Sequence, residues 1–86
     1  MRIPRKIRSQ GLVWHIRFTD DIADLGFTDY EKQEILIRKS VSQELKEAIF
    51  IHEIGHTINS TIDHTLLDSL SMQFYQVLKD NNLISI

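Results

Sequence analysis

The stretch Glu34–Phe50, "EILIRKSVSQELKEAIF", contains the point at which the sequence changes from one kind of secondary structure to another. Its first five residues, Glu34–Arg38, are rich in isoleucine and are bounded by polar residues, as in a β-strand. Ser40 and Ser42 each stand where a side chain can cap the helix-forming run that follows. The stretch therefore predicts a strand, a short turn and then a helix.

The residues before this stretch have the pattern of a small sheet. Leu12–Thr19, "LVWHIRFT", alternates with the period of two that is typical of a strand with one buried face. Ile3–Arg8 is a suitable partner strand, because the Ser9–Gly11 connection is short and ends in glycine. Gly26–Tyr30 fits a short strand or a turn. We expect a small antiparallel sheet of three or four strands, opened by a hairpin.

The end of this stretch and the residues after it predict two helices. Ala48–Ile51 is apolar nearly all round, so the first helix, extending to about Asn59, is expected to run through the middle of the domain. A second helix is expected from Asp63 or Thr65 to Lys79. Its predicted core stripe has apolar residues at spacings of three and four, and Met72 is expected in the core beside it. The stripe consists of Leu67, Leu70, Phe74 and Val77.

These elements define the fold class that we expect. It is α+β, with an antiparallel sheet packed against two helices. The chain of 86 residues is long enough for one small domain, residues 1–86. The sheet is expected within residues 1–39, the first helix within 40–60 and the second within 63–80.

Composition excludes several kinds of chemistry. The chain has no cysteine, so it can form no disulfide framework, cysteine zinc finger or thiol nucleophile. The net charge of −2 gives no general attraction to nucleic acid or to membranes. The first residues are basic but are not followed by an apolar segment of signal-peptide length, so we expect a cytoplasmic protein.

The first predicted helix carries the motif "HEIGH", His52–His56. Histidines four residues apart on a helix lie on one face, so both imidazoles can bind one metal ion. Two imidazoles together with a carboxylate ligand from a later part of the chain suit Zn²⁺ best among the usual ions. Glu53, beside the first ligand, can take a proton from a water that the metal activates and pass it to a leaving amine. Gly55, between the histidines, suggests a close approach by sheet backbone or by substrate.

The motif resembles the active-site helix of the zincin metallopeptidases. The order of hairpin, strand, "HEIGH" helix and second helix is similar to small zinc metallopeptidases encoded by phages and prophages. The resemblance covers most of the chain and implies His52 and His56 as zinc ligands and Glu53 as general base. It also implies that Glu34–Arg38 is the edge strand with which a peptide substrate pairs.

The third ligand is expected after the motif, where Asp63, His64 and Asp68 are available. Asp68 is our first choice, because it lies one residue from the predicted stripe and can face the first helix. The alternatives are His64 as ligand and Asp68 as a capping-box partner of Thr65. Asp63 is better suited to cap the second helix. His15 is expected to face solvent.

The predicted function is that of a zinc metallopeptidase, with Zn²⁺ as cofactor and a protein or peptide as substrate, such as a single regulatory protein. Tyr30 and Tyr75 are candidates to stabilise the oxyanion. The alternative function is a non-catalytic, metal-binding phage regulator or protein-interaction module. Glu53 separates the two, because a structural zinc site needs no general base. No nucleic-acid or membrane partner is expected.

Overall fold

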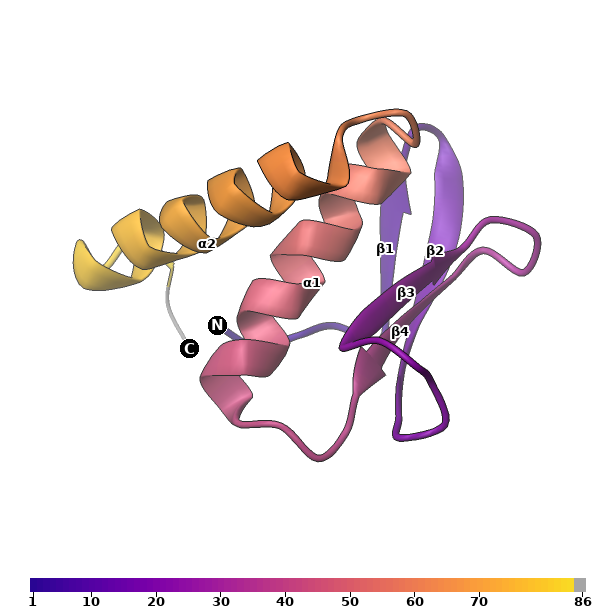
Figure 1. Ribbon diagram of the computed structural model, residues 1–86, viewed down its shortest axis with the longest axis horizontal. Coiled ribbons are helices and arrows are strands. Elements are labelled where there is room, and N and C mark those ends of the chain that lie inside the picture. The colour runs from indigo at the N-terminus through magenta and orange to yellow at the C-terminus, as the bar shows by residue number, and fades with distance from the viewer. Residues whose placement is uncertain (85–86) are drawn as a thin grey trace.

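The computed structural model describes residues 1–84 and has the predicted α+β fold (Figure 1). Its four strands and two helices are β1 (Lys6–Ser9), β2 (Leu12–Thr19), β3 (Gly26–Asp29), β4 (Glu34–Arg38), α1 (Gln43–Ile58) and α2 (His64–Asp80). Figure 1 shows α1 against one face of the sheet and α2 against α1, with the far half of α2 extending past α1. None of the helices within residues 1–84 is long and apolar enough to cross a membrane.

The sheet is mixed, whereas the sequence predicted antiparallel pairing throughout. Its strand order is β1-β2-β4-β3, and β2 and β4 run parallel. The β3–β4 hairpin is antiparallel, as is the β1–β2 hairpin. The β3–β4 hairpin places β4 in the interior of the sheet. There, Ile35 and Ile37 are fully buried and Leu36 is only 8% exposed. A strand that is apolar on both faces is most stable in the interior of a sheet.

The prediction that Glu34–Arg38 forms an edge strand is therefore wrong. β4 pairs with β2 on one side and with β3 on the other. The two edges are β1 and β3. A peptide that adds a strand to this sheet can therefore pair with β1 or with β3 but not with β4.

The first helix forms as its sequence predicts. The Ser42 side chain accepts a hydrogen bond from the Leu45 backbone N–H at 3.2 Å, so Ser42 is the N-cap. Ala48, Ile49 and Phe50 are buried. Ile49 and Phe50 form the core with Trp14 and with the isoleucines of β4. The helix thus runs through the middle of the domain, with the sheet on one side and α2 on the other.

The second helix is rotated relative to the prediction. Leu67 is buried as expected, but the next buried positions are Ser71 and Tyr75. The rest of the expected stripe is exposed: Leu70 by 41%, Phe74 by 60% and Val77 by 54%, and Met72 beside it by 52%. Tyr75 takes the inner position because its hydroxyl donates a hydrogen bond to the buried Glu47 carboxylate at 2.9 Å. A buried carboxylate without a donor costs more than an exposed leucine or valine.

Candidate metal centre

Three histidines from two helices converge where α1 ends and α2 begins. His52 and His56 lie one turn apart on α1, and His64 is the first residue of α2. One ring nitrogen from each of the three lies within 4.8 Å of the other two. The Nε2 atoms of His52 and His56 are 3.1 Å apart. Of the residues that the structure describes, these form the one cluster suited to a metal ion.

The donor set fits zinc. With zinc–nitrogen bonds of about 2.0 to 2.1 Å, two nitrogens in a tetrahedral site are about 3.3 to 3.4 Å apart. The observed spacing of the His52 and His56 nitrogens is close to this value. Three imidazoles are also a ligand set of catalytic zinc sites, which leave the fourth position to water or substrate.

The turn between the helices places His64. Asn59 accepts hydrogen bonds from the Thr61 N–H and hydroxyl at 3.0 Å and 2.7 Å. Asp63 accepts one from the Leu66 N–H at 2.8 Å, which confirms Asp63 as the N-cap of α2. The helix therefore begins at His64, directly beside the end of α1.

Gly55 lets the two helices approach closely at this point. A Cβ atom on Gly55 would lie 2.5 Å from Cδ1 of Leu67. The prediction that sheet backbone or substrate approaches Gly55 is therefore wrong, because the neighbour is a side chain of α2. The contact between Gly55 and Leu67 holds the start of α2 against the histidine face of α1.

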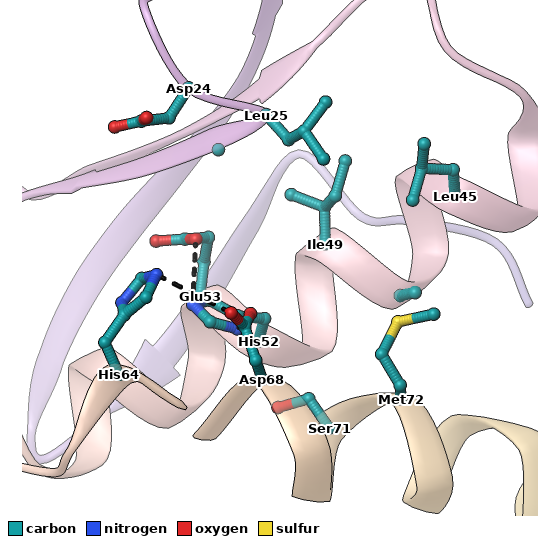
Figure 2. Close-up of a pocket in the computed structure, with 12 residues that line it drawn as sticks. Asp24, Leu25, Leu45, Ile49, His52, Glu53, His64, Asp68, Ser71 and Met72 are labelled. Atoms are coloured by element: carbon teal, nitrogen blue, oxygen red, sulfur yellow. Dashed lines mark ion pairs between the residues drawn. The ribbon is translucent and has the colours of Figure 1, made fainter. Parts of the chain in front are cut away.

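Asp68 binds His52 at the nitrogen that faces away from His56. Its Oδ1 atom lies 2.9 Å from Nδ1 of His52, and its Oδ2 atom lies 3.9 Å from Nε2 of His64 (Figure 2). A carboxylate on Nδ1 fixes the tautomer and ring orientation so that Nε2 is free to bind a metal. The geometry thus favours His64 as third ligand and Asp68 as the residue that orients His52, although our first choice for the ligand was Asp68.

Glu53 lies beside the cluster without belonging to it. It is 4% exposed, and its Oε1 atom accepts a hydrogen bond from the Thr28 hydroxyl at 2.7 Å. Its Oε2 atom lies 3.7 Å from Nε2 of His52. Burial raises the pKa of the Glu53 carboxyl, and the Thr28 hydrogen bond opposes part of that increase. The carboxyl is thus held in place by β3, with one oxygen turned toward the histidines.

The two helical histidines are suited to hold a metal at neutral pH. Burial lowers the pKa of both His52 and His56, and His64 lowers both further, while the Asp68 carboxylate raises both. His56 also lowers the pKa of His52. Metals bind the neutral imidazole, so a low pKa reduces competition from protons.

The approach of β3 to this site depends on Gly26, which the sequence interpretation did not single out. A Cβ atom on Gly26 would lie 2.5 Å from Cγ2 of Ile49 and 3.0 Å from Oε2 of Glu53. A larger residue there would force the Ile49 side chain, the Glu53 side chain or β3 itself to shift. The available signal was a glycine at the start of a candidate strand, which marks close backbone approach.

A cavity of about 300 Å³ opens beside the cluster, between α1, α2 and the start of β3 (Figure 2). Its polar end is formed by His52, Glu53, His64 and Asp68. Its apolar end is formed by Leu25, Leu45, Ile49 and Met72. The cavity thus joins the candidate metal centre to a space that fits an apolar side chain.

The remaining candidates lie elsewhere or at the margin. His15 is exposed on β2, as expected, and is not part of the cluster. The Tyr30 hydroxyl donates a hydrogen bond to the His56 carbonyl oxygen at 3.1 Å, which places it next to the site. The Tyr75 hydroxyl is bound to Glu47 and to Lys79, in a separate group of polar residues.

Comparisons of this chain with protein-family models, with curated proteins and with solved structures find no match. The geometry and chemistry of the site itself are therefore the basis for inferring a function.

Proposed function

We propose that the protein is a zinc-dependent peptidase that hydrolyses peptide bonds. The observation that carries the proposal is the position of Glu53. Its carboxylate is buried beside three potential ligands, yet those three already provide the protein donors of a catalytic zinc site. Burying a carboxylate beside imidazoles that must be neutral to bind a metal is costly, so its retention here is best explained by a chemical role.

His52, His56 and His64 would hold the zinc, which would supply Lewis acidity to polarise a carbonyl group and to lower the pKa of water. Glu53 is positioned to accept the proton of the attacking water and to deliver it to the leaving amine. Its raised pKa suits both steps, because a general base works best when its pKa approaches the working pH. The Thr28 hydroxyl fixes one oxygen and leaves the other toward the histidines.

The substrate strand in this proposal is β3. Within residues 1–84 this edge strand pairs with β4 alone, which leaves its other side open to an extended peptide. Gly26, at the start of β3, lies against Glu53, so a peptide on this edge would pass over the site. The apolar end of the cavity would accept an apolar side chain next to the scissile bond. A single regulatory protein as substrate and a cytoplasmic site of action belong to the same proposal.

The test compares wild type with Glu53→Gln, which keeps the size and the Thr28 contact but removes the base. Both proteins are loaded with zinc and incubated with unfolded casein and with a mixed peptide library, and new termini are counted by mass spectrometry. We expect cleavage by wild type, its loss on chelation and its return with zinc. Glu53→Gln should bind zinc normally and cleave at least 100-fold more slowly.

Equal product from the two proteins would contradict the peptidase proposal. Absence of product from both proteins, together with retained zinc binding, would support the alternative of a non-catalytic metal-binding module. His56→Ala is the control that removes metal as well as activity.

A further inference from the structure

The second helix presents an apolar stripe to solvent, formed by Leu66, Leu70, Phe74 and Val77. Their exposed fractions are 50%, 41%, 60% and 54%. Spacings of four, four and three place all four on one face of α2. In a small soluble domain such a stripe usually faces the core. Here α1 covers the neighbouring arc, Leu67, Ser71 and Tyr75, and within residues 1–84 the stripe stays uncovered.

The surface around the stripe has the composition of an interface. Asp68 is the single charged residue from position 64 to position 77, and it is bound to His52. The other exposed residues on this part of α2 are mainly uncharged and polar, such as Ser69, Gln73 and Gln76. Interface centres are depleted in charged residues, whereas the surfaces of free helices are usually rich in them.

We propose that this stripe is the interface of a homodimer in which two α2 helices pack antiparallel about a two-fold axis. The stripe is nearly symmetric about residue 72 in the sequence. Leu70 and Phe74 lie at equal distances on either side of this position, and Leu66 and Val77 lie at nearly equal distances. An antiparallel partner therefore places Leu70 against the partner's Phe74, and Leu66 against the partner's Val77. A surface of this kind is self-complementary, which a two-fold interface requires.

The exposed area agrees with a small stable dimer. Four side chains at about half exposure leave roughly 350 Å² uncovered, if a fully exposed side chain of this size presents roughly 150 to 200 Å². The smallest stable interfaces bury about 1,200 Å² in total, of which about 60% is non-polar. Each subunit must then contribute roughly 350 Å² of non-polar surface, which is what the stripe provides.

The first test is sedimentation velocity from about 5 to about 500 μM, a range that brackets a micromolar dissociation constant. Chelator is present throughout, so that no metal ion links two chains. Wild type should sediment as a dimer at the upper concentrations. Phe74→Glu and Leu70→Lys should each be monomeric, because each places two unpaired charges in the interface. Gln76→Glu adds the same charge to α2 outside the stripe and should behave as wild type.

Mixing the two monomeric variants tests the register. In a mixed dimer Lys at position 70 faces Glu at position 74, and the second contact keeps its native leucine and phenylalanine. The mixture should therefore recover dimer, which neither variant forms alone. Both variants should retain wild-type circular dichroism and zinc affinity, so this test is independent of the proposed peptidase activity.

Two results would overturn the proposal. One is a wild type that remains monomeric over the whole concentration range, which would leave the stripe to a different partner. The other is a dimer that Phe74→Glu does not weaken.

Discussion

Nδ1 of His52 lies 2.9 Å from Oδ1 of Asp68, while Nε2 of the same ring lies 3.1 Å from Nε2 of His56. The ring thus lies between a carboxylate and the candidate metal centre. This arrangement fixes one nitrogen by a hydrogen bond and leaves the other for a metal.

The first prediction separates the roles of Asp68 and His64. Asp68→Asn should weaken zinc binding about 10- to 100-fold, because it removes the charge that orients His52. His64→Ala should weaken it more, since it removes a donor atom. Competition with a chromophoric chelator measures both constants. Ser69→Ala, an exposed change on the same turn of α2, is the control. A larger loss for Asp68→Asn than for His64→Ala would restore Asp68 as the ligand.

The second prediction concerns stability with and without metal. When free zinc is 100 times the dissociation constant, zinc binding raises the free energy of unfolding by about 2.7 kcal/mol. That gain raises the Tm by about 10 to 20 °C. Thermal melts followed by circular dichroism should show the increase in wild type and its reversal by chelator. His56→Ala should melt at the same temperature with and without zinc, and a zinc-dependent shift in this variant would place the metal elsewhere.

The third prediction tests how α2 is rotated. Leu67→Ala should cost about 2 to 5 kcal/mol of unfolding free energy, because Leu67 is buried against Gly55. Leu70→Ala should cost less than about 1 kcal/mol, because Leu70 is 41% exposed. Urea unfolding in a Phe74→Glu background measures both without a contribution from self-association. Equal costs would mean that Leu70 faces α1, as the apolar spacing alone suggests.

Sequence periodicity predicted the elements correctly but not their neighbours. The Ile35–Ile37 run identifies a strand, and its continuous apolar character indicates an interior position. The resemblance to the zincin metallopeptidases implied an edge, but it does not reveal that the β3–β4 hairpin inserts β4 beside β2. For α2, spacing identified the apolar arc. The rotation depends on the hydrogen bond between Tyr75 and Glu47, two residues 28 positions apart.

The site was predictable to the extent that it is local. His52, Glu53 and His56 follow from one helix turn and its geometry. The placement of His64 and Asp68 depends on the turn at 59–63 and on the approach of α2 at Gly55. Such an approach follows from packing between distant segments, which a periodic pattern does not contain. Thr28 and Gly26 were missed for the same reason, since β3 meets Glu53 only in the folded domain.

The fourth prediction uses the buried Glu47, which is 2% exposed. Burial alone would raise its pKa, but hydrogen bonds from Tyr75, Gln43 and the amino group of Met1 outweigh burial, and the pKa lies below its ordinary value. The unfolded chain therefore binds a proton at a higher pH than the folded one. The stabilisation is complete above the ordinary glutamate pKa of about 4.5 and is lost as the pH falls through the lower, folded value.

Glu47→Gln separates this effect from that of Glu53, the other buried carboxyl within residues 1–84, whose pKa is raised. We expect the difference in unfolding free energy between wild type and Glu47→Gln to increase as the pH rises from about 2.5 to about 5 and then to stay constant. Urea unfolding at a series of pH values gives this difference directly. Glu44→Gln removes an exposed carboxylate of α1 that pairs with Lys79 of α2, and it should show a much smaller dependence. A difference that falls with rising pH would mean that burial, and not the three donors, sets the pKa of Glu47.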